Sequence, residues 1–176
     1  VWQEMSKGLM ESRPSRMLEV LMQTGAWFEL DMGVSAVSDE TLRHLDQAAA
    51  GHAVLEMRYA LLMGNQGGAS CLPEQLFKVP RDCQELATLL IQQADTLGAV
   101  LGTLREGTID SAGTILDWLL SADAQRRPER FGLLLGCLRL AQRIDAGQAD
   151  LLAAVVDGGH APGGDRGGRL RLSKRL

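Results

Sequence analysis

Cysteine, histidine and long apolar runs are scarce in this sequence, and each scarcity excludes a class of protein. Three cysteines are too few and too scattered for a disulfide scaffold or a CxxC metal site, so we expect a reducing, cytoplasmic setting. Only three histidines are present, which leaves little material for a metal centre or for histidine-based catalysis. No run approaches the roughly 18 apolar residues of a membrane span, which excludes an integral membrane protein.

The charge is divided unevenly along the chain. Residues 166–176 carry five basic residues and no acidic one, whereas residues 1–165 carry 13 basic against 22 acidic residues. A mildly acidic body with a basic tail is not typical of a protein whose only function is to bind nucleic acid. The length of 176 residues predicts one compact domain with a short appendage. Because the chain begins with Val1 and shows no signal-peptide pattern, we expect a fragment of a longer protein.

Helical spacing of apolar residues dominates, and there is no alternating strand pattern and no repeat of 20–50 residues. The sequence therefore predicts an all-α fold, a bundle of about six to eight helices. The expected helices are a remnant around 2–10, one between Ser12 and Gly25, one from Ser38 to Met63, and two opened by Pro73 and Pro80. A short helix follows, capped by Asp110 or Ser111, with an apolar stripe of Ile115, Leu116, Leu119 and Leu120. One more helix is opened by Pro128, and a last one covers about 146–156.

Few groups of residues in the sequence could form a catalytic or metal-binding site. His44 and His52 are about two helical turns apart and could share a face, but no third ligand is in reach, which argues against a metal site. Asp39, Glu40 and Asp46 near the start of a helix are typical of dipole stabilisation. The cysteines lie at apolar helix positions or loop edges, where we expect buried, inert thiols. The glycine-rich stretch 158–168 lacks the context of a phosphate loop and predicts a flexible linker.

Two basic clusters remain, and both surround the start of a predicted helix. The first consists of Lys7, Arg13 and Arg16. The second consists of Arg126, Arg127 and Arg130, around Pro128. Guanidinium groups beside free backbone N–H donors suit phosphate oxygens. The alternative is that each cluster is only a solvated face.

A family resemblance accompanies these patterns. The string VWQEMSKGLMESRPSRMLEVLMQTGA, which begins at Val1, resembles a segment of bacterial CCA-adding tRNA nucleotidyltransferases. The resemblance resumes in family order at Thr41–Ala49, Met57–Leu62, Val79–Ala87 and Thr114–Phe131. Its first and last blocks are the most specific, and the tail matches weakly. It implies that residues 1–25 are the end of the RNA-binding body, residues 26–145 an HD-type helical domain, and residues 146–176 a C-terminal helix with a basic, glycine-rich tail.

The HD-type domain of that family is, where intact, a metal-dependent phosphohydrolase. In this sequence the family's metal ligands fall on Glu40, Gly64, Asn65 and the neighbourhood of Ala94 and Asp95, so only one carboxylate survives at its place. A divalent ion needs several imidazole and carboxylate ligands from different helices. The resemblance therefore implies a degenerate HD domain with no metal and no catalytic residue of its own.

The function expected from this resemblance is a C-terminal scaffold that docks tRNA. An upstream catalytic head would add CCA with Mg²⁺ and CTP or ATP, and this chain would need no cofactor. Phosphate contacts are expected at the six basic residues of the two clusters. The alternative is a non-catalytic module that binds protein, for example as a homodimer, because the acidic body would repel RNA except at basic patches. Residual phosphohydrolase activity is a third and weaker hypothesis.

Overall fold

The computed structural model describes residues 1–30, 37–64, 78–106 and 111–157, and this part of the chain is entirely helical, which confirms the all-α prediction. Within it there are nine helices, because one expected helix is split and a short one was not foreseen, while the helix expected to open at Pro73 begins outside the described residues. Their bounds are α1 Trp2–Met10, α2 Pro14–Gln23, α3 Ala26–Glu29, α4 Asp39–Ala50, α5 Leu55–Gly64, α7 Arg81–Glu106, α8 Ser111–Ser121, α9 Pro128–Leu140 and α10 Ala146–Asp157.

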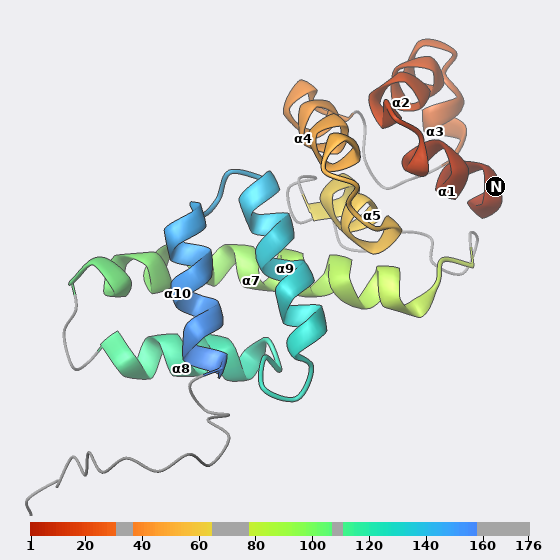
Figure 1. Cartoon of the computed structure of the whole chain (residues 1–176). Coiled ribbons are helices and arrows are strands. Elements are labelled where there is room, and N and C mark those ends of the chain that lie inside the picture. Colours follow the sequence, from red (N-terminus) through yellow and green to blue (C-terminus); the bar gives the residue numbers. More distant parts are fainter. Residues whose placement is uncertain (31–36, 65–77, 107–110, 158–176) are drawn as a thin grey trace, which may run out of the picture.

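Helix α7 is the spine of the arrangement (Figure 1). It contacts α5, α8 and α9, and α9 in turn contacts α5 and α10. Helices α1 to α3 lie beside α4 and α5, so residues 1–30 reach the spine through that pair. In α7, which follows Pro80 as expected, Cys83, Leu86 and Leu90 are buried. None of the helices in the described ranges is long and apolar enough to cross a membrane.

The helix expected over residues 38–63 is two helices, so that expectation was wrong. Ser38 caps α4 as predicted by accepting a hydrogen bond from the Thr41 N–H at 3.2 Å. The helix ends at Ala50 because Gly51 and then His52, with φ 55°, turn the chain before α5. The Ala53 N–H donates to the Ala48 carbonyl and the His52 N–H to that of Ala49, which is the hydrogen-bond pattern of a Schellman ending.

The buried face of α8 also differs from the expected stripe. Leu116 and Leu120 are half exposed, at 50% and 59%, whereas Trp118 and Leu119 are buried. The apolar residues of this helix lie on more than one of its faces, so their periodicity alone does not predict which face is buried. Trp118 determines which face is buried, because its ring packs edge to face against the ring of Phe131, with the ring centroids 5.8 Å apart.

Candidate functional site

The first basic cluster lies on α1 and α2, at the end of the molecule where the chain starts (Figure 1). Gly8 of α1 faces Met17 of α2 so closely that a Cβ at Gly8 would overlap the Met17 sulfur, and Lys7 and Arg16 are the chain neighbours of these two residues. Lys7 lies 2.9 Å from Glu4, and both side chains are largely exposed. Arg16 lies 3.6 Å from Glu19. Arg13 is exposed and makes no ion pair within the described residues.

Ser12 does not cap the start of α2; a side chain of another helix binds the first turn instead. Arg13 occupies the cap position without a side-chain hydrogen bond. Instead, Asp46 of α4 accepts two hydrogen bonds from Ser15, from the backbone N–H at 3.1 Å and from the hydroxyl at 2.8 Å. A carboxylate therefore already occupies one of the donors that a phosphate would need, and the positive end of α2 is partly neutralised. Asp46 stabilises α2, not its own helix.

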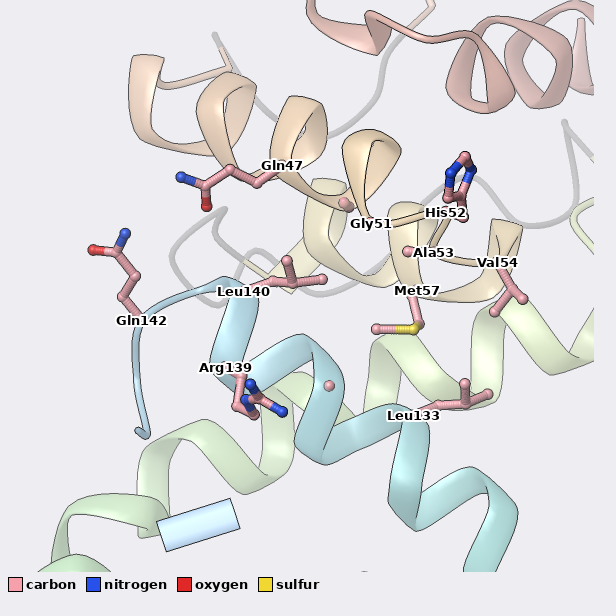
Figure 2. A pocket seen from close by; sticks show the side chains of 12 residues that line it. Gln47, Gly51, His52, Ala53, Val54, Met57, Leu133, Arg139, Leu140 and Gln142 are labelled. Atoms are coloured by element: carbon pink, nitrogen blue, oxygen red, sulfur yellow. The ribbon is translucent and has the colours of Figure 1, made fainter. Parts of the chain in front are cut away.

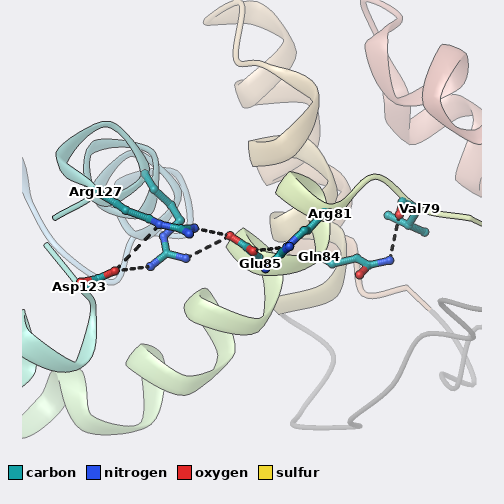
Figure 3. Close-up of polar contacts among 7 residues, drawn as sticks. Val79, Arg81, Gln84, Glu85, Asp123 and Arg127 are labelled. Atoms are coloured by element: carbon teal, nitrogen blue, oxygen red, sulfur yellow. Dashed lines mark hydrogen bonds and ion pairs between the residues drawn. The ribbon is translucent and has the colours of Figure 1, made fainter.

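The second basic cluster lies where α8 turns into α9, and an ion-pair network engages it (Figure 3). Glu85 of α7 is the centre: its two oxygens lie 2.7 Å from Arg81 Nε, 2.6 Å from Arg127 Nη1 and 3.3 Å from Arg130 Nη1. Asp123 lies 3.9–4.0 Å from Arg126, Arg127 and Arg130. The arginines at the start of α9 thus hold that helix against α7.

The electrostatics of this network follow from its geometry. Hydrogen bonds from Arg81 and Arg127 stabilise the carboxylate of Glu85 and lower the pKa of that side chain. Arg130 is 23% exposed, and its buried Nε atom has no hydrogen-bond partner in the part of the chain that the structure describes. Arg126 is 86% exposed, and among the described residues only the long contact to Asp123 holds it. Of the three predicted phosphate contacts here, Arg126 is the one least engaged.

The positions where the family's metal ligands would fall do not form a metal site in the described part of the chain. Asn65 lies outside the described residues. Glu40 is exposed in the first turn of α4, and Asp95 is exposed on α7. Gly64 ends α5 against α7, and a Cβ at that position would lie 2.6 Å from Leu90 Cδ2. The described residues contain no group of three or more histidines, cysteines or carboxylates able to hold an ion. These residues do not fit a divalent metal.

The remaining titratable candidates behave as structural groups. His44 is buried, and burial lowers its pKa, while His52 lies beyond the end of α4 and is exposed, so the two do not share a face. Cys83 and Cys137 are buried, as expected, and burial raises the pKa of the Cys83 thiol to about 11 and that of Cys137 to about 12, which disfavours the reactive thiolate. Cys71 and His160 lie outside the described residues.

Two charged positions escaped the sequence reasoning. Arg81 joins the Glu85 network, and its spacing of four residues from Glu85 on one helix was the available signal. Arg58 is 4% exposed and donates to the carbonyls of Leu9, Glu11 and Ala53 at 2.7–2.9 Å. It ties the end of α1 to the turn before α5. Only the apolar residues around Arg58 hinted at its burial.

Comparison with known proteins finds bacterial relatives that are named CCA-adding enzyme or multifunctional CCA protein. The chain is 35% identical over 147 residues to a CCA-adding enzyme of Bordetella pertussis, and the match covers 82% of this chain and 37% of that protein. It is 34% identical to a multifunctional CCA protein of Dechloromonas aromatica, with 78% and 40% covered. A CCA-adding enzyme of Pseudomonas entomophila is 33% identical, with 79% and 37% covered. The chain thus spans about 40% of the length of the relatives it matches. No family model and no solved structure matches.

Proposed function

Because this chain belongs to the family of bacterial CCA-adding enzymes and corresponds to their C-terminal region, we propose that it is a non-catalytic helical scaffold that docks tRNA. Addition of CCA, with Mg²⁺ and CTP or ATP, would be carried out by a catalytic head outside this sequence. Docking of a folded RNA by such a scaffold is directed by phosphate charge and by shape.

Of the two basic clusters, the first has the side chains that are most available to bind RNA phosphates. The observation that carries this view is the state of Arg13, which is exposed and makes no ion pair within the described residues. Arg16 and Lys7 are 76% and 70% exposed and pair only with carboxylates on their own helices. Exchange of such an exposed pair for a phosphate costs little, because the pair itself is worth about 1 kcal/mol or less.

The second basic cluster is the weaker part of the proposed docking surface. A phosphate that approached Arg127 or Arg130 would compete with Glu85, which lies 2.6 Å and 3.3 Å from these groups. Arg126 can bind without that competition, since its only partner within the described residues is Asp123 at 3.9 Å. We therefore expect Arg126 to contribute a contact and the other two to position α9.

We further propose that the HD-type domain is degenerate and has no phosphohydrolase activity. The packing of α5 on α7 supports this, because Leu90 fills the space into which any side chain at position 64 would have to grow. A histidine there would have to displace a leucine from the core. The exposed carboxylates of Glu40 and Asp95 supply too few ligands to activate a water molecule on a metal.

The direct test of docking is a titration of the chain with tRNA at two salt concentrations. Three or four phosphate contacts predict that affinity falls roughly tenfold or more between 50 and 200 mM salt. No binding at low salt, or binding that salt does not change, would exclude docking. Turnover of a generic phosphodiester with added Mn²⁺, Ni²⁺ or Mg²⁺ that is lost in Asp95→Ala would exclude the degenerate domain.

The alternative is a protein-binding or dimerisation module. Leu116 and Leu120 on α8 and Leu151 on α10 are 50–59% exposed, and these side chains would offer apolar area to a protein partner. Light scattering separates the two functions: a stable dimer that ignores added tRNA supports the alternative, and a monomer that binds tRNA supports docking.

A further inference from the structure

A pocket that neither basic cluster touches lies between the C-terminal end of α4, the first turn of α5 and the last two turns of α9 (Figure 2). Its volume of about 550 Å³ lies within the range that small-molecule sites occupy. The apolar part of its wall consists of Ala48, Ala53, Val54, Met57, Leu133 and Leu140. The polar part of the wall consists of Gln47, His52, Arg139 and Gln142.

The two helices that frame the pocket end in the same way. His52 follows α4 with φ 55°, and Gln142 follows α9 with φ 54°, so both are non-glycine residues in the left-handed region. After α9 the Arg143 N–H donates to the Leu138 carbonyl and the Gln142 N–H to that of Arg139, again a Schellman ending. Glycine is the residue usually found there, and another residue costs about 1 kcal/mol. Both strained residues line this pocket.

The polar side chains around the pocket form no polar contact with other described residues of the protein. Gln47, His52, Arg139 and Gln142 make no side-chain hydrogen bond and no ion pair within the described residues, unlike Arg127, which is 2.6 Å from Glu85. Figure 2 shows Gln47 and Gln142 on one side of Leu140, with Met57 at the centre and Leu133 on the other side. None of the described lining residues is acidic, although the chain as a whole is.

We propose that this pocket binds one unpaired nucleotide of an RNA. The base would pack on Met57, Leu133 and Leu140, the amides of Gln47 and Gln142 would bond its edge, and Arg139 would contact the adjoining phosphate. Splayed bases are recognised by stacking on aromatic rings or guanidinium planes and by hydrogen bonds to their edges; in this pocket Met57 and the two leucines take the part of the stacking platform, and the amides bind the edge. One arginine and no carboxylate line the pocket within the described residues, and this balance favours an anionic ligand over a cationic one. The inference rests on the proposed docking of RNA and gives it a site with base contacts.

The test uses nuclear magnetic resonance of the full chain titrated with single-stranded RNA tetranucleotides of each base, and with the free nucleoside monophosphates. Saturable shifts are expected in the side-chain amides of Gln47 and Gln142 and in the Met57 methyl group. Binding that appears with the monophosphates but not with the tetranucleotides would identify the ligand as a free nucleotide and overturn the assignment to RNA.

Two variants probe the pocket without harming the fold. Arg139→Gln removes the phosphate contact and should weaken tetranucleotide binding about tenfold. Val54→Asp places a carboxylate in the wall at the residue whose carbonyl accepts the first hydrogen bond of α5, from the Arg58 N–H at 3.2 Å. Aspartate is favoured at such a position, so this variant should be at least as stable and yet bind about tenfold less tightly. Arg43→Gln, which removes the same charge from exposed α4, should change binding less than about twofold.

The outcomes separate this inference from the proposed function. If tRNA binds the chain but the pocket resonances do not move, or move equally in Val54→Asp, the pocket is not a nucleotide site and docking stands. If the tetranucleotides shift the pocket resonances but tRNA does not bind in the salt titration, docking is wrong and the pocket stands.

Discussion

Two helices of this protein begin with the same dipeptide, and the protein uses the two starts differently. Arg13-Pro14 opens α2 and Arg127-Pro128 opens α9, with cap φ angles of −136° and −133°. At α2 a carboxylate of another helix, Asp46, binds the backbone of the first turn, and Arg13 makes no ion pair among the described residues. At α9 a carboxylate of another helix, Glu85, binds the arginine itself. The position of one distant acid therefore decides whether a basic helix start is available to a ligand.

The same contrast extends to how the two regions are held. Helices α1 and α2 are fixed by hydrogen bonds of the buried Arg58 and of the buried Ser15. The start of α9 is fixed by ion pairs whose carboxylate, Glu85, is 23% exposed. Salt acts mainly on charges near water, so it should weaken the α9 end more than the α1–α2 end.

Arg58→Leu should have the largest effect on stability. The change removes three hydrogen bonds to the carbonyls of Leu9, Glu11 and Ala53 and leaves those groups short of donors. We expect a loss of about 3 kcal/mol in the free energy of unfolding, measured by urea denaturation. Arg58→Lys, which keeps a cation but fewer donors, is the control and should lose less. Equal stability of Arg58→Leu and the native chain would show that α1 is not held in this way.

Asp46→Ala should have the next largest effect. It deprives the Ser15 N–H and hydroxyl of their acceptor, at a position where Ser15 is 3% exposed. The expected loss is about 1–2 kcal/mol, typical of a lost helix cap, and hydrogen exchange should accelerate in the first turn of α2. Asp46→Asn keeps an acceptor and should lose about half as much or less. Faster exchange in α4 with α2 unchanged would assign Asp46 to its own helix instead.

Glu85→Gln should have the smallest effect, about 1 kcal/mol at neutral pH, and that effect should depend on conditions. The pKa of Glu85 is lowered in the folded state, so its contribution is present above the unfolded value of 4.5 and is lost as the pH falls through the folded value. Denaturation of the native chain and the variant should therefore differ at pH 7 and converge in acid. Half-molar salt should shrink the difference at pH 7. A difference that neither acid nor salt reduces would contradict the surface ion-pair account.

Much of this fold could be predicted from the sequence because its signals are local. Pro128 was enough to place the start of α9, a helix in which Phe131, Leu134 and Leu138 are buried. Ser38 was enough to place the start of α4. The split after Ala50 was missed because Gly51 in a helical pattern signals only a modest cost, whereas the turn depends on the left-handed conformation of His52.

The candidate sites were less predictable because they depend on residues far apart in the chain. The basic residues are visible in the sequence, but no local pattern shows that Glu85 lies 42 positions before its partner Arg127 and 2.6 Å from it. The pocket of Gln47, Met57 and Arg139 likewise joins three elements, none with a recognisable motif. Linear spacing identifies which charges exist, and only the packing identifies which of them are free.

The most direct test of the central claim compares tRNA affinity after equal charge removal at the two helix starts. The double variant Arg13→Gln/Arg16→Gln should lose roughly tenfold or more in affinity at low salt and keep its stability, because these side chains are exposed and hold no other helix. The double variant Arg127→Gln/Arg130→Gln should lose about 1 kcal/mol or more of stability and no more than about threefold in affinity. The opposite order of the two affinities would contradict the account, and so would equal affinities.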